Sequence, residues 1–300
     1  MKKSLIAFAV LAASGAAFAQ SSVQLYGIVD LVVHKDKGND LALTSGGMSG
    51  SRIGFKGTKD VGAGLKANFA LEQGFDADTG LDNGVSSFSR QAYVGLAGAF
   101  GELKLGKVYT AYDDVAGATN PVFDSVFSPT GLFASGGYAA NPSNGLYYAT
   151  PAFGGVSGAV STNLEANNTA AKTTALHVKY EDGPLFVAAA YQQDGDVAKT
   201  HYTRLNASYD FGPAKLLAGV AKVGGAGDAT EVTLGADIPL SSGLVASAGL
   251  ATTDNGGTRT TGVGVGVAYS LSKEVTAYGG LRKDNNGGLS RVGAGLKVVF

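Results

Sequence analysis

Apolar and polar residues alternate with a period of two along most of the chain. Side chains on a β-strand point to opposite faces in turn, so this period predicts strands with one apolar face. The last segment shows the pattern clearly, with Val292, Leu296 and Phe300 on one face and Arg291 and Lys297 on the other. Strands that stand between lipid and water have this pattern.

Sixteen segments of this kind can be counted along the chain. They cover approximately residues 21–34, 49–59, 64–76, 87–98, 101–110, 144–150, 155–163, 173–180, 184–192, 200–209, 213–222, 229–237, 243–252, 260–269, 274–282 and 289–300. An even number brings both chain ends to one side, which suits a closed barrel, because an open edge in lipid leaves backbone groups unpaired. The sequence therefore predicts an all-β, 16-stranded antiparallel transmembrane β-barrel, with the weakest alternation over 144–163.

Short turns and longer polar connections follow each other along the chain, so one end of the barrel is expected to carry turns and the other loops. The interval of about 111–143 breaks this rhythm and is too long for a hairpin turn. A solvated surface loop is one interpretation. A loop folded against the wall is favoured, because Phe123, Phe127 and Phe133 are apolar groups that a solvated loop would leave in water.

The first nineteen residues have the three parts of a secretory signal peptide. Lys2-Lys3 is followed by an apolar run over Leu5–Leu11 and by the small-residue site Ala17-Phe18-Ala19. A buried N-terminal helix is disfavoured, because the three parts occur together and in order. We expect a signal peptide at 1–19 and a single barrel domain at 20–300.

Composition agrees with a β-rich exported chain and narrows the chemistry. Glycine is abundant with 46 residues, proline is scarce with 7, and cysteine is absent, which excludes disulfides and thiolate chemistry. The formal charge of −1 names no partner. Beyond the leader, no run approaches the roughly 20 apolar residues of a membrane helix, so a helical membrane protein is not expected.

Signatures of enzymes and cofactors are not found. His34, His177 and His201 stand on separate segments without metal-ligand spacing. Gly262–Gly266 lacks the spacing of a dinucleotide-binding loop and lies inside an alternating strand. No basic cluster with interleaved aromatic residues indicates a nucleic-acid surface. We expect no enzyme activity, no cofactor, no metal site and no nucleic-acid partner.

Five short motifs in order give the chain a full-length resemblance to a known family. They are Val23–Asp30, Gly50–Gly57, Gly64–Ala67 followed by Leu71–Phe75, Ser89–Leu96 with Phe100-Gly101, and the terminal Phe300. The chain resembles the general trimeric porins of Gram-negative outer membranes. The resemblance implies a sixteen-stranded barrel, a homotrimer, a third loop folded inward as a constriction, and Phe300 as a C-terminal assembly signal.

The resemblance also implies where the constriction lies. Members of the family place wall arginines opposite acidic residues of the inward loop. The constriction residues expected here are Arg52, Arg90, Lys56, Asp113, Asp114 and Asp124. This chain departs from the family where it leaves the loop: it reads Ala140-Asn-Pro-Ser-Asn-Gly145, where relatives often carry another basic residue. Ion selectivity weaker than the family norm is therefore expected.

Placing the apolar face of each strand against lipid predicts which charges line the lumen. The predicted lumen bases are Arg52, Lys56, Lys66, Arg90, Lys104, Lys179, Arg204, Lys215, Arg282, Arg291 and Lys297. The predicted lumen acids are Asp30, Glu72, Glu102 and Glu231. A cationic wall concentrates anions by electrostatic focusing, so an anion preference is expected. Single lysines could equally be solvated positions without effect. The pattern does not decide which residues around Tyr93 face the lipid. On strict alternation Arg90 points inward only if Tyr93 points outward.

The resulting expectation is an outer-membrane channel for passive diffusion of small hydrophilic solutes and inorganic ions. A substrate-specific channel of the same architecture is the alternative, and a barrel without a channel is a third interpretation. The expected surroundings are outer-membrane lipid and lipopolysaccharide. A saturable block of conductance by one solute would separate the first two interpretations.

Overall fold

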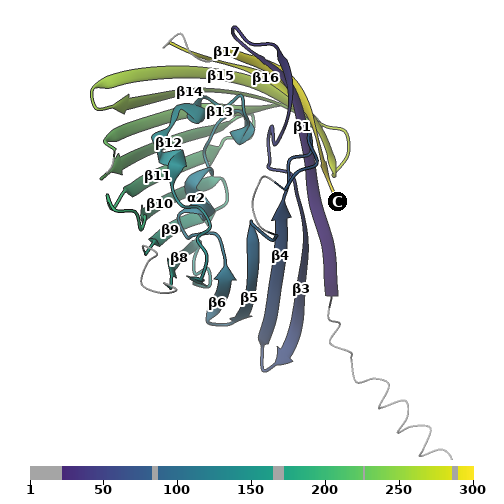
Figure 1. Cartoon of the computed structure of the whole chain (residues 1–300), viewed down its shortest axis with the longest axis vertical. Helices are drawn as coiled ribbons and strands as arrows, with labels where there is room; N and C mark the ends of the chain where they lie inside the picture. The colour runs from purple at the N-terminus through teal and green to yellow at the C-terminus, as the bar shows by residue number, and fades with distance from the viewer. Residues whose placement is uncertain (1–21, 83–86, 165–171, 226, 286–289) are drawn as a thin grey trace, which may run out of the picture.

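One barrel of antiparallel strands contains most of the chain (Figure 1). The computed structural model describes residues 22–82, 87–164, 172–225, 227–285 and 290–300. The strands are β1 (Ser22–Asp36), β2 (Leu41–Ser45), β3 (Arg52–Gly62), β4 (Leu65–Gly74), β5 (Gln91–Gly98), β6 (Gly101–Lys107), β7 (Gly145–Ala149), β8 (Val156–Asn163), β9 (Thr174–Asp182), β10 (Leu185–Gln193), β11 (His201–Asp210), β12 (Lys215–Gly224), β13 (Ala229–Ser241), β14 (Leu244–Asn255), β15 (Thr258–Ser270), β16 (Val275–Asp284) and β17 (Ser290–Val299). The predicted leader at 1–19 lies outside the described residues.

The barrel closes where the first strand meets the last. β1 pairs with β17 along one edge. Along its other edge it pairs with β3 near its start and with β2 near its end, so β2 and β3 together form one interrupted strand. The seventeen strand segments of the described residues therefore occupy 16 positions in a closed antiparallel barrel, as predicted. The short β2 was not predicted, because the second strand is interrupted between Ser45 and Arg52.

Phe300 takes part in this closure. Its backbone exchanges two hydrogen bonds with Gly27 of β1, at 2.9 and 3.1 Å. Its ring lies against Gly27, where a Cβ atom would stand 2.4 Å from the ring carbon Cζ. A glycine at this position therefore leaves the room that the terminal ring occupies.

The two faces of the barrel differ as the alternation predicts. On β15, Val263, Val265 and Val267 are exposed on the outer surface, whereas Gly262 and Gly264 point inward and are buried. The same apolar exposure recurs on the other strands, so the outer surface is a continuous apolar band. Among the described residues, no helix is long and apolar enough to cross a membrane.

The segment between β6 and β7 runs inside the ring of strands (Figure 1). It holds the short helices α2 (Asp113–Ala116), η1 (Val122–Asp124), η2 (Pro129–Leu132) and η3 (Ala134–Gly137). We call residues 108–144 the inner loop. Backbone N–H of Val122 donates to Ser247 Oγ on β14 at 2.8 Å, and the amide of Asn206 on β11 donates to the carbonyl of Val115. The inner loop is therefore fixed to the inner wall.

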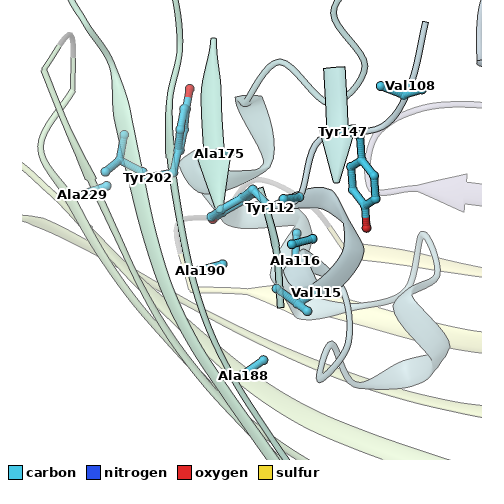
Figure 2. Close-up of a cluster of buried hydrophobic side chains, with 13 residues drawn as sticks. Val108, Tyr112, Val115, Ala116, Tyr147, Ala175, Ala188, Ala190, Tyr202 and Ala229 are labelled. Atoms are coloured by element: carbon cyan, nitrogen blue, oxygen red, sulfur yellow. The ribbon is translucent and has the colours of Figure 1, made fainter. Parts of the chain in front are cut away.

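Apolar packing holds the inner loop against the same part of the barrel. Figure 2 shows Tyr112, Val115 and Ala116 of the loop beside small alanines of the wall, such as Ala188 and Ala190 of β10. A second buried cluster joins Val122 and Phe127 to Val32 and Tyr278. Small inward residues on the strands leave the space that the loop's larger side chains fill.

Glycines of three neighbouring strands form the floor beneath one stretch of the loop. In the strand register Gly235, Gly249 and Gly264 lie side by side on β13, β14 and β15. A Cβ atom at Gly249 would stand 2.2 Å from the ring of Pro121, and one at Gly264 would stand 2.4 Å from the carbonyl oxygen of Phe127. We call Gly235, Gly249 and Gly264 the glycine floor.

Candidate pore constriction

Two arginines share one buried carboxylate on the inner wall. Arg90 Nε lies 2.7 Å from Glu72 Oε1, and Arg52 lies 3.9 Å from the same oxygen. The second oxygen of Glu72 accepts a hydrogen bond of 2.9 Å from the hydroxyl of Tyr26. Glu72 is 3% exposed at its side chain, whereas both arginines are partly open to the lumen. The group carries two positive charges and one negative charge, so its net charge is positive.

Arg90 and Tyr93 both point into the lumen, so the predicted condition that only one of them could do so was wrong. β5 begins at Gln91, and Arg90 therefore stands before the strand and is free of its alternation. Within the strand Val94 and Leu96 are exposed on the outer surface, which directs Tyr93 inward. The Arg90 guanidinium lies over the ring of Tyr109, 5.6 Å from its centre.

The wall lysines rest on tyrosine rings. Lys56 Nζ lies 4.9 Å from the ring centre of Tyr26 and forms no ion pair with a described carboxylate. Lys104 Nζ lies 5.2 and 5.1 Å from the ring centres of Tyr93 and Tyr147 and 3.1 Å from Glu102. Cation–π contacts of this kind fix an ammonium without neutralising its charge. Lys56 is thus outside the Arg52–Glu72–Arg90 group but remains an unneutralised cation beside it.

The acidic residues of the inner loop are held by hydrogen bonds. Tyr138 donates to Asp113 at 2.6 Å, Tyr147 donates to Asp114 at 2.7 Å, and the amide of Asn120 donates to Asp124 at 2.7 Å. Asp114 and Asp124 are exposed to the lumen, and Asp113 is half-buried.

Enclosure by loop and wall changes the ionisation of these acids. It removes water from around Asp113 and raises the pKa of its carboxyl, an effect that the hydrogen bond from Tyr138 and the nearby Arg90 only partly offset. The pKa of Asp114 is raised for the same reason, although Tyr147 and His177 favour its charged form.

Only Asp113 of the loop acids interacts electrostatically with a wall arginine of this group, and the basic neighbour of Asp124 is Arg204 of β11. Arg90 acts electrostatically on Asp113, and Asp113 in turn is influenced by Asp114 and Asp124. The other side of the loop is filled, since Tyr112 and Phe127 are almost fully buried against the wall. The charged side chains that stay partly exposed inside the barrel, such as Arg52, Arg90 and Lys104, lie on or beside β3, β5 and β6, and we call the space in front of them the open passage.

Some predicted lumen charges are covered by the inner loop. Arg204 is 5% exposed and donates to the carbonyl of Ala116 and to the hydroxyl of Ser135, both at 2.6 Å. Ser135 in turn donates to Glu231, which is 0% exposed. Asp30 is equally buried and accepts two backbone N–H bonds of 2.7 Å from the returning chain before β3. These three groups point inward as predicted, but they fix loops and do not line the open passage.

The lumen face also holds acids that the pattern did not reveal. Asp36 forms a bidentate pair with Arg291 at 2.7 and 2.8 Å, and Glu181 pairs with Lys179 at 3.1 Å. Asp237 accepts a hydrogen bond of 2.6 Å from the buried hydroxyl of Ser247. Asp36 and Glu181 lie at strand ends, beyond the clear part of the alternation, whereas Asp237 lies within β13. The wall is therefore less cationic than the sequence predicted.

The remaining predicted bases differ in their surroundings. Arg282 is buried and donates to the carbonyl of Ser128 at 3.3 Å. Lys66 lies opposite Asp60 in the strand register, near the end with the short turns and away from the constriction. Lys215 and Lys297 occupy inward positions of β12 and β17. None of these four contributes to the Arg52–Glu72–Arg90 group.

An asparagine stands where the chain leaves the inner loop. The side-chain amide of Asn141 donates to the backbone carbonyls of Ser89 and Arg90 at 3.2 and 2.8 Å, and the backbone carbonyl of Asn141 accepts a hydrogen bond of 2.8 Å from Lys107 Nζ. Asn141 thus fixes the backbone of Arg90 without adding a charge. Among the described residues, no group of three or more His, Cys, Asp or Glu side chains could hold a metal ion.

Comparison with known proteins decides the family. A family model described as Gram-negative porin matches residues 6–289. The chain belongs to the Gram-negative porins. It is 39% identical over 246 residues to outer membrane porin protein 32 of Delftia acidovorans, covering 72% of this chain and 68% of that protein. It is 32% identical over 289 residues to an outer membrane porin protein of Bordetella pertussis, covering 78% of this chain and 74% of that protein.

Solved structures agree with this assignment. The anion-selective porin from Comamonas acidovorans superposes with a TM-score of 0.83 at 26% identity, covering 94% of this chain and 100% of that one. OmpT of Vibrio cholerae, in its trimer form, shares the fold with a TM-score of 0.72 at 17% identity, covering 93% of this chain and 99% of that one. The chain is thus an outer-membrane porin, and the relatives that it matches are porins, which are channels and not enzymes.

Proposed function

We propose that this porin forms a water-filled channel for passive diffusion of small hydrophilic solutes and prefers anions. The observation that carries the proposal is the Arg52–Glu72–Arg90 group, whose net positive charge faces the lumen opposite the inner loop. The un-neutralised ammonium of Lys56 adds to it. Fixed charges in a narrow channel raise the local concentration of the opposite ion.

The loop acids reduce this preference without removing it. Asp113, Asp114 and Asp124 each accept a hydrogen bond, and the pKa of Asp113 is raised by burial. Similarity to the anion-selective porin from Comamonas acidovorans supports the same sign of selectivity. The preference is expected to be moderate, because most other lumen charges are paired.

The proposal includes the assembly and export expected from the sequence. The leader at 1–19 is cleaved, the barrel domain spans 20–300, and the mature protein assembles as a homotrimer in the outer membrane, among lipid and lipopolysaccharide. Phe300 serves as the C-terminal assembly signal, and its pairing with Gly27 at the barrel seam supports a role in closure.

The direct test is conductance of the purified protein in a planar lipid bilayer. Stepwise currents and a reversal potential of anion sign under a KCl gradient are expected. Current that rises linearly with solute concentration supports general diffusion, and saturation by one solute supports the substrate-specific alternative. Failure to conduct would reject the channel itself, and a reversal potential of cation sign would reject the anion preference alone.

Acidification is expected to strengthen the anion preference. The raised pKa of Asp113 and Asp114 means that these carboxyls take up protons earlier than ordinary aspartates as pH falls, while the wall arginines stay charged. Losing about one negative charge at roughly 5 Å from the ion path changes its energy by about 0.8 kcal/mol in a water-like dielectric. The chloride-to-potassium permeability ratio should therefore rise several-fold as the pH is lowered from neutral, measured from the reversal potential under a KCl gradient.

The matched control for the pH effect is the double variant Asp113→Asn/Asp114→Asn. It retains His177 and the wall, and it should show a higher ratio at neutral pH with little further change on acidification. An equal pH response in the variant would assign the effect to other groups.

A further inference from the structure

A recess in the pore wall lies beside the constriction, on β1 and β3–β6. It has a volume of about 250 Å³. Its lining includes the side chains of Gln24, Lys56, Thr58, Asn68, Tyr93 and Glu102. All six stand on inward positions of their strands, so the recess opens toward the passage and not toward lipid.

The strand register explains why the wall is hollow here. Lys56 of β3, Ala70 of β4 and Tyr93 of β5 lie side by side in one row. The small methyl group of Ala70 separates two long side chains that are about 10 Å apart across two strand spacings. In the next row the side chain of Asn68 lies against Gly95. A Cβ atom at Gly95 would stand 2.3 Å from Oδ1 of Asn68. The recess therefore has a cation at one end and an aromatic ring at the other.

The charged side chains of the recess favour a ligand with a single negative charge. Lys56 has no carboxylate partner among the described residues and rests only on the ring of Tyr26. Glu102 is already held by Lys104 at 3.1 Å and by the amide of Asn68 at 2.9 Å. Lys56 can thus bind one carboxylate, whereas Lys104 is already paired with Glu102 and does not offer a second free cation.

The ring at the other end selects the ligand's shape. Tyr93 has Lys104 near its ring, at 5.2 Å from the ring centre, and it also lines the recess. A ring bound there can form an offset or edge-to-face pair with Tyr93, a contact that a saturated ring cannot make equally well. Gln24 and Thr58 supply polar groups around the carboxylate end.

We propose that this recess is a transient binding site for small aromatic monocarboxylates, with the carboxylate on Lys56 and the ring on Tyr93. The inference rests on the proposed channel function and names a solute class that the channel retains on its way through. The site is open to the passage, so bound solute exchanges with the stream of ions and reduces the current while it is bound.

The test compares two acids of equal charge and similar size in the planar bilayer. KCl current through the full protein is titrated with sodium benzoate and, separately, with sodium cyclohexanecarboxylate. Benzoate should reduce the current in a saturable way, with a dissociation constant about three- to tenfold lower than that of cyclohexanecarboxylate, the range expected for one aromatic pair. Equal reduction by the two acids would overturn the inference.

Single substitutions test which side chains of the recess bind the two acids. Tyr93→Leu should abolish the difference between the two acids, and Tyr93→Phe should retain it, because phenylalanine keeps the ring. Lys56→Gln should weaken both acids alike, since it removes only the cation. Tyr148→Leu, on the outward face of β7, is the matched control and should leave the difference unchanged.

The outcomes separate this inference from the proposed function. Ordinary conductance together with an aromatic preference that persists in Tyr93→Leu overturns the recess and leaves the channel intact. Loss of all conductance in the natural protein overturns both.

Discussion

Replacing Arg52 and Arg90 together with alanine is expected to turn the channel from anion-preferring to cation-preferring. Both arginines share the carboxylate of Glu72, which is 3% exposed, so their removal leaves a negative wall opposite the loop acids. Each unit charge at roughly 5 Å from the ion path is worth about 0.8 kcal/mol in water. The two charges together change the energy of a passing ion by about 1.6 kcal/mol before screening, with opposite sign for chloride and potassium. The chloride-to-potassium permeability ratio should therefore fall at least about tenfold, measured from the reversal potential near about 0.1 M salt, where screening over ~10 Å is moderate.

Two further variants test whether the change in selectivity comes from the charges of the constriction. Adding Glu72→Gln to the double variant removes the leftover negative charge and should restore part of the ratio. Arg259→Ala removes an arginine exposed in the β14–β15 hairpin, outside the constriction, and should leave the ratio within about 20% of its original value, because a distant exposed charge is screened. A double variant that stays anion-preferring would show that the sign of selectivity is set elsewhere.

The strands could be predicted from the sequence because the lipid imposes a strict alternation on them. Each of the sixteen predicted segments overlaps an observed strand. β2 was missed because it pairs with β1 over only Leu41–Ser45, too short for a period to be visible. The weakly patterned stretch 144–163 nevertheless forms β7 and β8, and the inward Tyr147 and Ser161 of these strands contact the inner loop.

The wall charges were harder to predict than the strands, and for a physical reason. Alternation tells which face a side chain occupies, but not what covers that face. Arg204 and Glu231 point inward as expected and are then buried beneath the inner loop. Arg90 shows the opposite case, since it reaches the lumen from a position that precedes its strand.

The tyrosines of the site carry a signal that period-two analysis could have used. Tyr26 and Tyr147 stand on inward positions, and each joins an acid to a base. Tyr26 donates to Glu72 beneath Lys56, and Tyr147 donates to Asp114 beneath Lys104. Each tyrosine thus contacts a wall cation through its ring and a carboxylate through its hydroxyl. An inward tyrosine marks either a pore residue or a contact with the inner loop, because Tyr202 and Tyr278 also point inward but are buried with loop residues.

Glycine positions on the inner wall decide how wide the passage is, because the inner loop occupies the rest of the lumen. The loop lies against β13–β15 only as closely as the glycine floor allows. A larger residue in the floor must push the loop toward Arg52 and Arg90 on the opposite wall. The width of the passage therefore depends on the glycine floor, whose residues carry no charge and do not line the passage.

Gly249→Ala is therefore expected to reduce single-channel conductance and to destabilise the barrel. The added methyl would stand 2.2 Å from Cγ of Pro121, whereas ordinary contacts begin at 3.4 Å, so the proline ring must retreat into the lumen. Overpacking of this kind costs about 1–3 kcal/mol, which a lower midpoint of thermal or denaturant unfolding would report. Gly136→Ala in the same loop is the matched control, because nothing lies within 4 Å of a Cβ atom there. An unchanged conductance in Gly249→Ala would show that Pro121 does not rest on the floor, and an increased one would show that the loop detaches from the wall instead of advancing across the lumen.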